Sequence, residues 1–233
     1  MKYIHYMVGL LLIAGSMISC TSTPKDNELS SKEKEEGWEL LFNGKDFTGW
    51  RVYGGGEPDS LWKVADGVLS STPKGTRTFI MTADQYENFE LSLEWKIGPQ
   101  GNSGILYRLT EPGWAPGRAP EYQLIDQKGW KGKLKDEQHT AANYDMDKPV
   151  GSDVKPVGEW NTTKIIVNGA NVQHYLNGVK VVEYDLWTDE WYQKKANSKW
   201  KNEKNYGMAK KGHIALQGHG GETGFRNIKI RKL

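Results

Sequence analysis

The segment from Asn88 to Ile97 constrains the fold most strongly, because apolar and polar residues alternate along it without a break. Its apolar positions are Phe89, Leu91, Leu93, Trp95 and Ile97. Successive side chains of a β-strand point to opposite faces of the sheet. The alternation therefore predicts an antiparallel strand with one face in a core and the other in water.

Shorter β-rich segments recur along the rest of the chain. Two turns between them, Asn168-Gly169 and Asn177-Gly178, are typical of tight hairpins. We expect strands at Trp38–Phe42, Trp62–Val64, Gly67–Ser71, Thr78–Thr82, Ser103–Leu109, Glu121–Asp126, Thr163–Val167, Val172–Leu176, Val179–Tyr184, His213–Gln217 and Phe225–Arg231. Thr188, followed by two acidic residues, predicts one helix that ends near Trp200. The pattern predicts an all-β fold, a jelly-roll β-sandwich of two antiparallel sheets with one short surface helix.

The N-terminus has the pattern of an export signal rather than of a folded element. Lys2 precedes an apolar run from Met7 to Ile18, which is too short to span a membrane. Cys20, the only cysteine, follows a sequence similar to a lipobox, although Met17 stands where leucine is usual. We predict a lipoprotein signal peptide at residues 1–19 and lipidation of Cys20. The alternative is an ordinary signal peptide cut nearby, which leaves a lone thiol.

The predicted anchor sets the domain limits and the localisation. Residues 20–36 are polar and predict a flexible linker, and residues 37–233 form one domain. Thr21 gives no inner-membrane retention signal. We therefore expect export and lipid anchoring to the outer membrane of a Gram-negative bacterium, in a periplasmic or surface-facing position.

Charge and aromatic content restrict the partners. The formal net charge is +2, which gives no basis for attracting polyanions, so we expect no nucleic-acid partner. The chain has 10 Trp and 11 Tyr against 5 Phe, and rings with a polar group suit sugar faces. Packing inside a β core is the alternative use of these rings.

Polar residues on three predicted strands are the candidate site. Gln217 and His219 share one strand face and are followed by glycines that leave room for a ligand. Asn102 and Arg108 share a face of a second strand, and Glu121 and Gln123 share a face of a third. With His174, these residues could line one concave sheet. A structural Arg108–Glu121 ion pair is the alternative.

The long polar segment Gln127–Glu159 contains further candidates, His139 and Tyr144 among them. Loops of this length in compact domains usually serve a function, such as forming the wall of a cleft. A surface loop without a function is the alternative.

Several motifs in combination resemble the 3-keto-disaccharide hydrolase domain family. They are GWELLFNGKDFTGW, LWKVADGVL, GNSGILYR, EYQLID, GEWNTTKIIVNGANVQHYLNG and HIALQGHGGETGFRNIKI. The resemblance implies a concanavalin A-like jelly roll and a glycoside substrate whose C3 hydroxyl has been oxidised to a ketone. A C3 ketone acidifies the C2 proton, so a base can remove it. The aglycone then leaves from C1 by elimination, and water adds to the resulting enone.

Such a reaction needs a base, a group that stabilises the enolate and an acid for the leaving group. His219 is the preferred base because its ordinary pKa is near neutral, and Glu121 is the competing choice. Arg108 with Gln123 or Gln217 would stabilise the enolate oxygen, and Tyr144, His139 or His174 would assist the leaving group. Asn102, Gln123, His139, His174 and Gln217 are the expected substrate-binding residues.

Three alternatives stay open at this stage. His219 and Glu121 could hold a divalent metal ion, although no close ligand spacing requires one. The domain could bind carbohydrate without catalysis. A conventional glycoside hydrolase ranks third, because the nearest match to an E-x-D-x-x-E pattern, at Glu57, lacks the final carboxylate.

Overall fold

The computed structural model describes residues 25–56, 58, 61–72 and 77–233. The predicted signal peptide and the lipidated Cys20 lie outside these residues, as does Glu57. None of the helices in the described ranges is long and apolar enough to cross a membrane.

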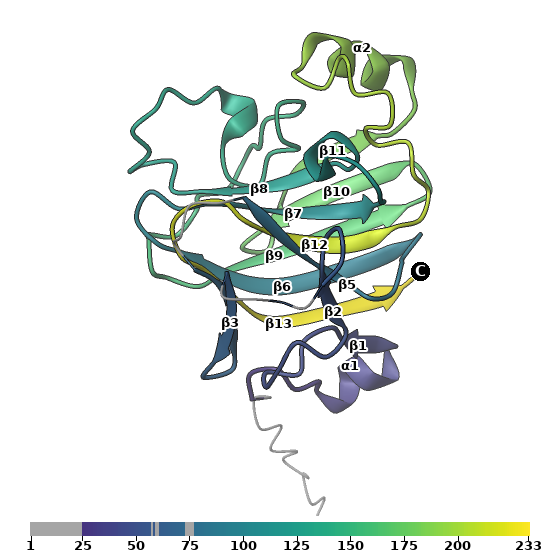
Figure 1. The fold of residues 1–233 in the computed structure, drawn as a ribbon. Helices are drawn as coiled ribbons and strands as arrows, with labels where there is room; N and C mark the ends of the chain where they lie inside the picture. Colours follow the sequence, from purple (N-terminus) through teal and green to yellow (C-terminus); the bar gives the residue numbers. More distant parts are fainter. Residues whose placement is uncertain (1–24, 57, 59–60, 73–76) are drawn as a thin grey trace, which may run out of the picture.

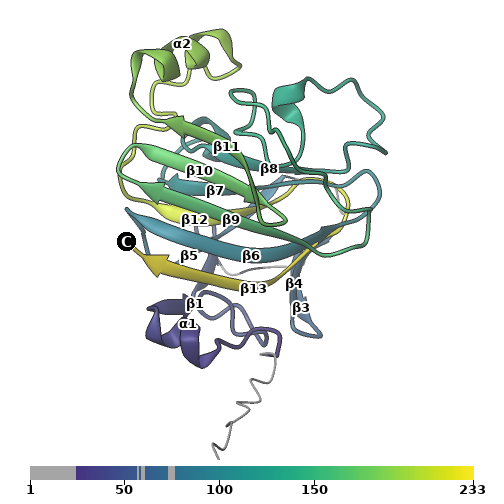
Figure 2. The ribbon, with the colours of Figure 1, turned by 180° about the vertical axis from the view of Figure 1, so that it is seen from behind.

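The larger sheet carries the alternating segment at its centre. Within the described residues it has eight strands. Their order is β11 (Val179–Asp185), β10 (Asn171–Leu176), β9 (Asn161–Asn168), β6 (Phe89–Ile97), β13 (Thr223–Lys232), β4 (Val68–Ser71) and β3 (Trp62–Ala65), and β1 (Trp38–Leu40) pairs with β13. Figure 2 shows this sheet from its outer side.

The second sheet has five strands in the described part of the chain. Their order is β2 (Trp50–Val52), β5 (Thr78–Thr82), β12 (His213–Gly218), β7 (Asn102–Leu109) and β8 (Glu121–Ile125). All the pairings in both sheets are antiparallel, so the predicted jelly-roll sandwich is confirmed. Strand β2 was not predicted, because three residues are too few to show alternation.

The core lies between the two sheets. The apolar face of β6 is fully covered, with Phe89, Leu91, Leu93 and Trp95 at most 1% exposed. Ile214 and Leu216 of β12 belong to the same core cluster. Burying one such side chain contributes roughly 1.5–3 kcal/mol to folding. The alternation that predicted β6 therefore also marks the main source of stability.

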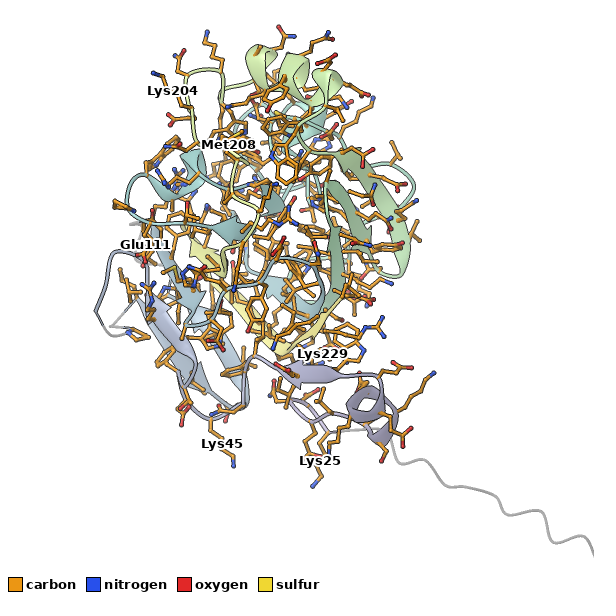
Figure 3. All side chains as sticks on the ribbon, turned by 90° about the vertical axis from the view of Figure 1, so that its right-hand side faces the viewer. Lys25, Lys45, Glu111, Lys204, Met208 and Lys229 are labelled. Carbon is orange, nitrogen blue, oxygen red and sulfur yellow. The ribbon has the colours of Figure 1, made fainter. Side chains whose placement is uncertain are left out.

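Helix α2 (Asp189–Asn197) begins where the sequence predicted, because the Thr188 hydroxyl accepts a hydrogen bond of 3.2 Å from the Trp191 amide. Two short 3-10 helices, η1 (Ala115–Gly117) and η2 (Asp136–Gln138), lie in loops. In Figure 1, α2 and the long loop after β8 lie at one end of the sandwich, and β1 and the N-terminal segment lie at the other. The labels of Lys204 and Lys25 mark these two ends in Figure 3.

The prediction of a flexible linker over residues 20–36 is wrong for residues 25–36, and the prediction of a single helix is wrong as well. Helix α1 (Ser31–Glu35) is held by a capping box between Ser30 and Glu33. Asn27 is buried and exchanges hydrogen bonds with Asn227, at 2.6 and 2.9 Å. Asn227 lies in a bulge of β13, so the Asn27 side chain satisfies a backbone amide that the sheet leaves free.

Candidate active site

The outer face of the five-stranded sheet has an apolar part and a polar part. Phe79 and Met81 of β5, Leu106 of β7 and Ala215 of β12 form a small apolar cluster with Ala115 and Ala119 of the loop before β8. Strand positions two apart share a face. Next to the cluster, the same face therefore carries polar side chains, and these form a pocket.

The polar pocket has a cavity volume of about 30 Å³. Residues from strands and from five loops line it, and they are Arg77, Asn102, Pro116, Glu121, Gln123, Tyr144, Lys199, Gln217 and His219. The cavity has room for about one water molecule. A sugar ring needs more space, so the long side chains at the rim, Arg77 and Lys199, must move to admit one.

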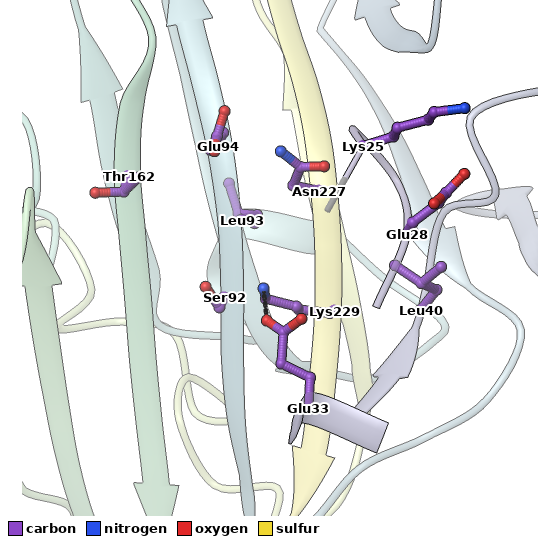
Figure 4. A pocket seen from close by; sticks show the side chains of 10 residues that line it. All are labelled: Lys25, Glu28, Glu33, Leu40, Ser92, Leu93, Glu94, Thr162, Asn227 and Lys229. Carbon is purple, nitrogen blue, oxygen red and sulfur yellow. Dashed lines mark hydrogen bonds and ion pairs between the residues drawn. The ribbon is translucent and has the colours of Figure 1, made fainter. Parts of the chain in front are cut away.

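A larger cavity of about 320 Å³ lies on the opposite sheet, beneath the N-terminal segment (Figure 4). Two of the three glutamates in its lining are ion-paired, Glu33 with Lys229 and Glu94 with Arg226. These ion pairs hold the N-terminal segment and the strands together. The smaller pocket is the better candidate for catalysis, because Glu121, Tyr144, Lys199 and His219 in its lining have perturbed pKa values.

Glu121 is the most perturbed acid in the pocket. Its side chain is 4% exposed, and burial raises its pKa to about 7, although the nearby cations Lys199 and Arg77 oppose the shift. Gln217 donates a hydrogen bond of 3.3 Å from Nε2 to Oε1 of Glu121. A carboxyl group with a pKa near 7 can accept a proton and return it at neutral pH.

Gly104 makes room for Glu121. A Cβ atom at position 104 would lie 2.1 Å from Oε1 of Glu121, which no real contact allows. Strand β7 runs between β12 and β8, so only a glycine here lets the Gln217 and Glu121 side chains meet over it.

His219 does not have the near-neutral pKa that favoured it as the base. Burial, and then the charges of Arg77 and Lys199, lower its pKa to about 4. The Arg77 guanidinium donates a hydrogen bond of 3.1 Å to Nε2 of His219. The imidazole is therefore neutral at physiological pH and serves as an acceptor that orients Arg77.

Lys199 and Tyr144 form another wall of the pocket. The Lys199 side chain is exposed as a whole, but its ammonium group lies 3.8 Å from the centre of the Tyr144 ring and 4.3 Å from that of Trp200. Burial of this group lowers the pKa of Lys199, although the charges of Glu121 and Asp145 oppose the shift. Burial raises the pKa of Tyr144 to about 12, so its hydroxyl is protonated and can donate.

Six of the nine residues predicted for catalysis or substrate binding line the pocket. They are Asn102, Glu121, Gln123, Tyr144, Gln217 and His219. The alternating pattern of strands β7, β8 and β12 placed their side chains correctly. The long loop after β8 contributes Tyr144 to this wall.

The prediction that Arg108 faces the cleft is wrong. A bulge between β7 and β12 gives Arg108 a positive φ of 54°. Its guanidinium turns to the edge of the sandwich and donates to the carbonyl oxygens of Glu87 at 2.8 Å and Gly169 at 2.9 Å. Arg108 therefore links the two sheets and forms no ion pair with Glu121.

The predictions for His174 and His139 are also wrong. His174 is fully buried between the sheets, where its Nδ1 lies 2.9 Å from the carbonyl oxygen of Ala141 and its Nε2 lies 2.9 Å from the hydroxyl of Tyr107. Alternation placed it on the core face of β10. His139 follows η2 and does not line the pocket.

Arg77, Pro116 and Lys199 were missed by the sequence reasoning. All three lie in loops, where no periodicity indicates which way a side chain points. Lys199 follows α2, and lysines there are expected simply from the helix dipole. Only the tertiary fold brings these residues to Glu121.

The pocket does not fit a divalent metal ion held by His219 and Glu121, which the sequence had allowed as an alternative. The described residues contain no group of three or more His, Cys, Asp or Glu side chains that could hold one. Glu121 and His219 are the only such residues in the lining of this pocket, and two cations stand beside them. The hydrogen bond from Arg77 also occupies an imidazole nitrogen of His219.

The fold and the site together define a β-sandwich enzyme that acts on carbohydrate. Its chain belongs to the family described as the 3-keto-alpha-glucoside-1,2-lyase-like domain, whose family model matches residues 37–231. A 3-keto-disaccharide hydrolase from Bacteroides thetaiotaomicron is 32% identical to it, over 100% of each chain.

Solved structures agree with this assignment. A crystal structure of a candidate glycosyl hydrolase from Parabacteroides distasonis is 40% identical, with a TM-score of 0.85, and the match covers 90% of this chain and 100% of that one. A Bacillus subtilis protein with a galectin-like fold matches 84% of this chain and 94% of its own with a TM-score of 0.52. At 13% identity, the second match concerns the fold alone.

Proposed function

We propose that the protein cleaves 3-keto-glycosides, with Glu121 as the base that removes the C2 proton. The observation that carries the proposal is a buried carboxyl group with a pKa of about 7 in a pocket that also holds two cations. Asn102, Gln123 and Gln217 offer amide groups to the sugar hydroxyls. Family membership and the relative named a 3-keto-disaccharide hydrolase support the substrate class.

The first step moves the C2 proton to the Glu121 carboxylate. The electrons of the C2–H bond form a C2=C3 double bond, and the ketone oxygen becomes an enolate oxyanion. Arg77 and Lys199 are the cationic side chains in the pocket lining, and they stabilise this negative charge. They take the role that the sequence had assigned to Arg108.

The second step expels the aglycone. The enolate re-forms the C3 ketone, the C2=C3 electrons move to make C1=C2, and the C1–O bond breaks. The Tyr144 hydroxyl protonates the departing oxygen, and Lys199 beside its ring stabilises the tyrosinate that results. The proton held by Glu121 then returns to Tyr144. Water can add across the enone at C1, which makes the overall reaction a hydrolysis.

The test compares a 3-keto-glucoside with its unoxidised parent glucoside. We expect the purified protein to release the aglycone, with enone absorbance, from the 3-keto substrate alone. Glu121→Gln should slow this release at least about a hundredfold, and Glu159→Gln at an exposed position should not. Binding of both sugars without turnover would instead support a carbohydrate-binding module. Cleavage of the unoxidised parent would support a conventional glycoside hydrolase.

We also propose that the enzyme is exported and anchored through a lipid on Cys20 to the outer membrane. The support is the apolar run before the only cysteine of the chain. Metabolic labelling with a fatty-acid analogue should mark the wild-type protein and leave Cys20→Ala unmarked. Label on both proteins would contradict the proposal.

A further inference from the structure

Trp114 is a large aromatic side chain that the proposed reaction does not use. It directly precedes η1 and is 50% exposed. Most tryptophans in the described chain are buried or half-buried. The exposed part of the Trp114 ring makes no contribution to the core. A single exposed ring is common on protein surfaces, and the position of this one relative to the pocket decides whether it can bind a ligand.

The loop that carries Trp114 is firmly held. Glu111 pairs with Arg51 at 2.5 Å and accepts a hydrogen bond of 2.6 Å from the Gly54 amide. The Tyr53 hydroxyl bonds to the carbonyl oxygens of Thr110 and Gly113, at 3.2 and 3.1 Å. Figure 3 labels Glu111 on this loop. These contacts fix the loop before Trp114, and the Gly117 amide after it donates a hydrogen bond of 3.0 Å to the Trp114 carbonyl oxygen. The backbone at Trp114 is therefore held in place for a ligand.

Two observations place Trp114 next to the polar pocket. Pro116, two residues later, lines the pocket itself. The Trp114 ring also lies 5.9 Å from the Trp200 ring, which in turn lies under the Lys199 ammonium and 6.3 Å from Tyr144. The tryptophan therefore stands just outside the wall formed by Tyr144 and Lys199.

We propose that Trp114 is the platform on which the leaving group of the substrate stacks. This inference rests on the proposed function. The reacting sugar needs the polar side chains around Glu121, so the group on C1 must extend out of the pocket past Tyr144, which protonates its oxygen. The occupant at Trp114 is then a flat or apolar ring face, either an aromatic aglycone or a second pyranose.

The test uses three 3-keto-glucosides that differ only in the leaving group, which is methyl, phenyl or glucosyl. For Trp114→Ala we expect kcat/KM to fall about tenfold on the phenyl and glucosyl substrates, mainly through KM. The methyl substrate, which cannot reach the ring, should be turned over as by wild type. Trp114→Phe should keep most of the wild-type preference for the phenyl and glucosyl substrates over the methyl substrate. Trp114→Leu, which has no flat face, should lose this preference.

The outcomes separate the two proposals. A loss on only the phenyl or only the glucosyl substrate would support the platform and identify its occupant. Equal kcat/KM ratios between variant and wild type on all three substrates would overturn the platform and leave the proposed function intact. No turnover of any substrate by wild type would overturn the proposed function, and the platform with it. Thermal unfolding of Trp114→Leu shows whether a general loss comes from misfolding.

Discussion

Gln217 on β12 donates a hydrogen bond of 3.3 Å to Glu121 on β8, although strand β7 separates the two. The contact exists because Gly104 on β7 has no side chain between them. Gln217 thus fixes the carboxyl group, while burial raises its pKa to about 7. Substitutions can test separately the space above Gly104, the proton affinity of Glu121 and the positive charges beside it.

Gly104→Ala should displace Glu121, because the new methyl carbon would lie 2.1 Å from Oε1. We expect kcat to fall at least a hundredfold and stability to fall by roughly 1–3 kcal/mol, as for other overpacked sites. Urea unfolding and steady-state kinetics measure the two effects. In a Glu121→Ala background the same change should cost little stability. An equal cost in both backgrounds would show that the clash is with another group.

Glu121→Gln should reduce kcat about a hundredfold to ten-thousandfold, the usual contribution of a positioned base. It should also change how stability depends on pH. Because the folded pKa of about 7 lies above the ordinary 4.5, the wild type loses stability as pH rises between these values. The glutamine side chain does not ionise, so the variant does not lose this stability as pH rises.

The stability difference between Glu121→Gln and wild type should therefore grow from pH 4.5 to pH 7 and then level off, at about 3 kcal/mol in favour of the variant. Urea unfolding at pH 5, 6, 7 and 8 measures it. His219 affects both proteins alike, so it cancels in the difference. A difference that does not vary with pH would mean that the pKa of Glu121 is ordinary.

Lys199→Met should move the acidic limb of the kcat/KM profile to higher pH. The Lys199 charge lowers the pKa of Glu121, so its removal raises that pKa further. The maximal rate should fall as well, about tenfold to a thousandfold, because the enolate loses one of its cations. Lys199→Arg should restore the position of the limb. Lys201→Met, at an exposed neighbouring position, is the matched control and should leave the profile unchanged.

Alternation in the sequence was sufficient to predict the sandwich and five of the six predicted residues that line the pocket, all except Tyr144 of the long loop. A strand of nine residues such as β6 shows its buried face directly, and Glu121, Gln123 and Gln217 follow from the same rule. The rule failed at Arg108, because one residue in a bulge reverses the face to which the side chain points. It failed at β2 because three residues carry no period.

The cations of the site could not be predicted for a different reason. Arg77 and Lys199 are more than a hundred residues apart and lie on loops, so no local pattern relates them to each other or to Glu121. The choice of base depended on the same information. Only burial shows that the pKa of His219 falls to about 4 while that of Glu121 rises to about 7.

The pH dependence of the wild-type enzyme should distinguish these two bases. With Glu121 as the base, kcat/KM rises with pH up to about 7, because the carboxyl group must lose its proton to accept another. With His219 as the base, the rise would end near pH 4 and the rate would stay constant above it. His219→Leu should retain the limb near pH 7 and lose about tenfold in kcat, because Arg77 loses its acceptor.

His174→Ala should destabilise the fold without acting on the pocket, since the imidazole bridges Ala141 and Tyr107 inside the core. The change leaves a cavity, removes the partner of the Ala141 carbonyl oxygen and leaves the Tyr107 hydroxyl with Tyr184 alone, which costs about 3–5 kcal/mol. Urea unfolding measures the loss. His139→Ala, at a half-buried position outside the pocket, should stay within about 0.5 kcal/mol of wild type. At a temperature where the His174 variant is still folded, its KM for a 3-keto-glucoside should equal that of wild type. If the fully folded variant had a raised KM, His174 would take part in substrate binding after all.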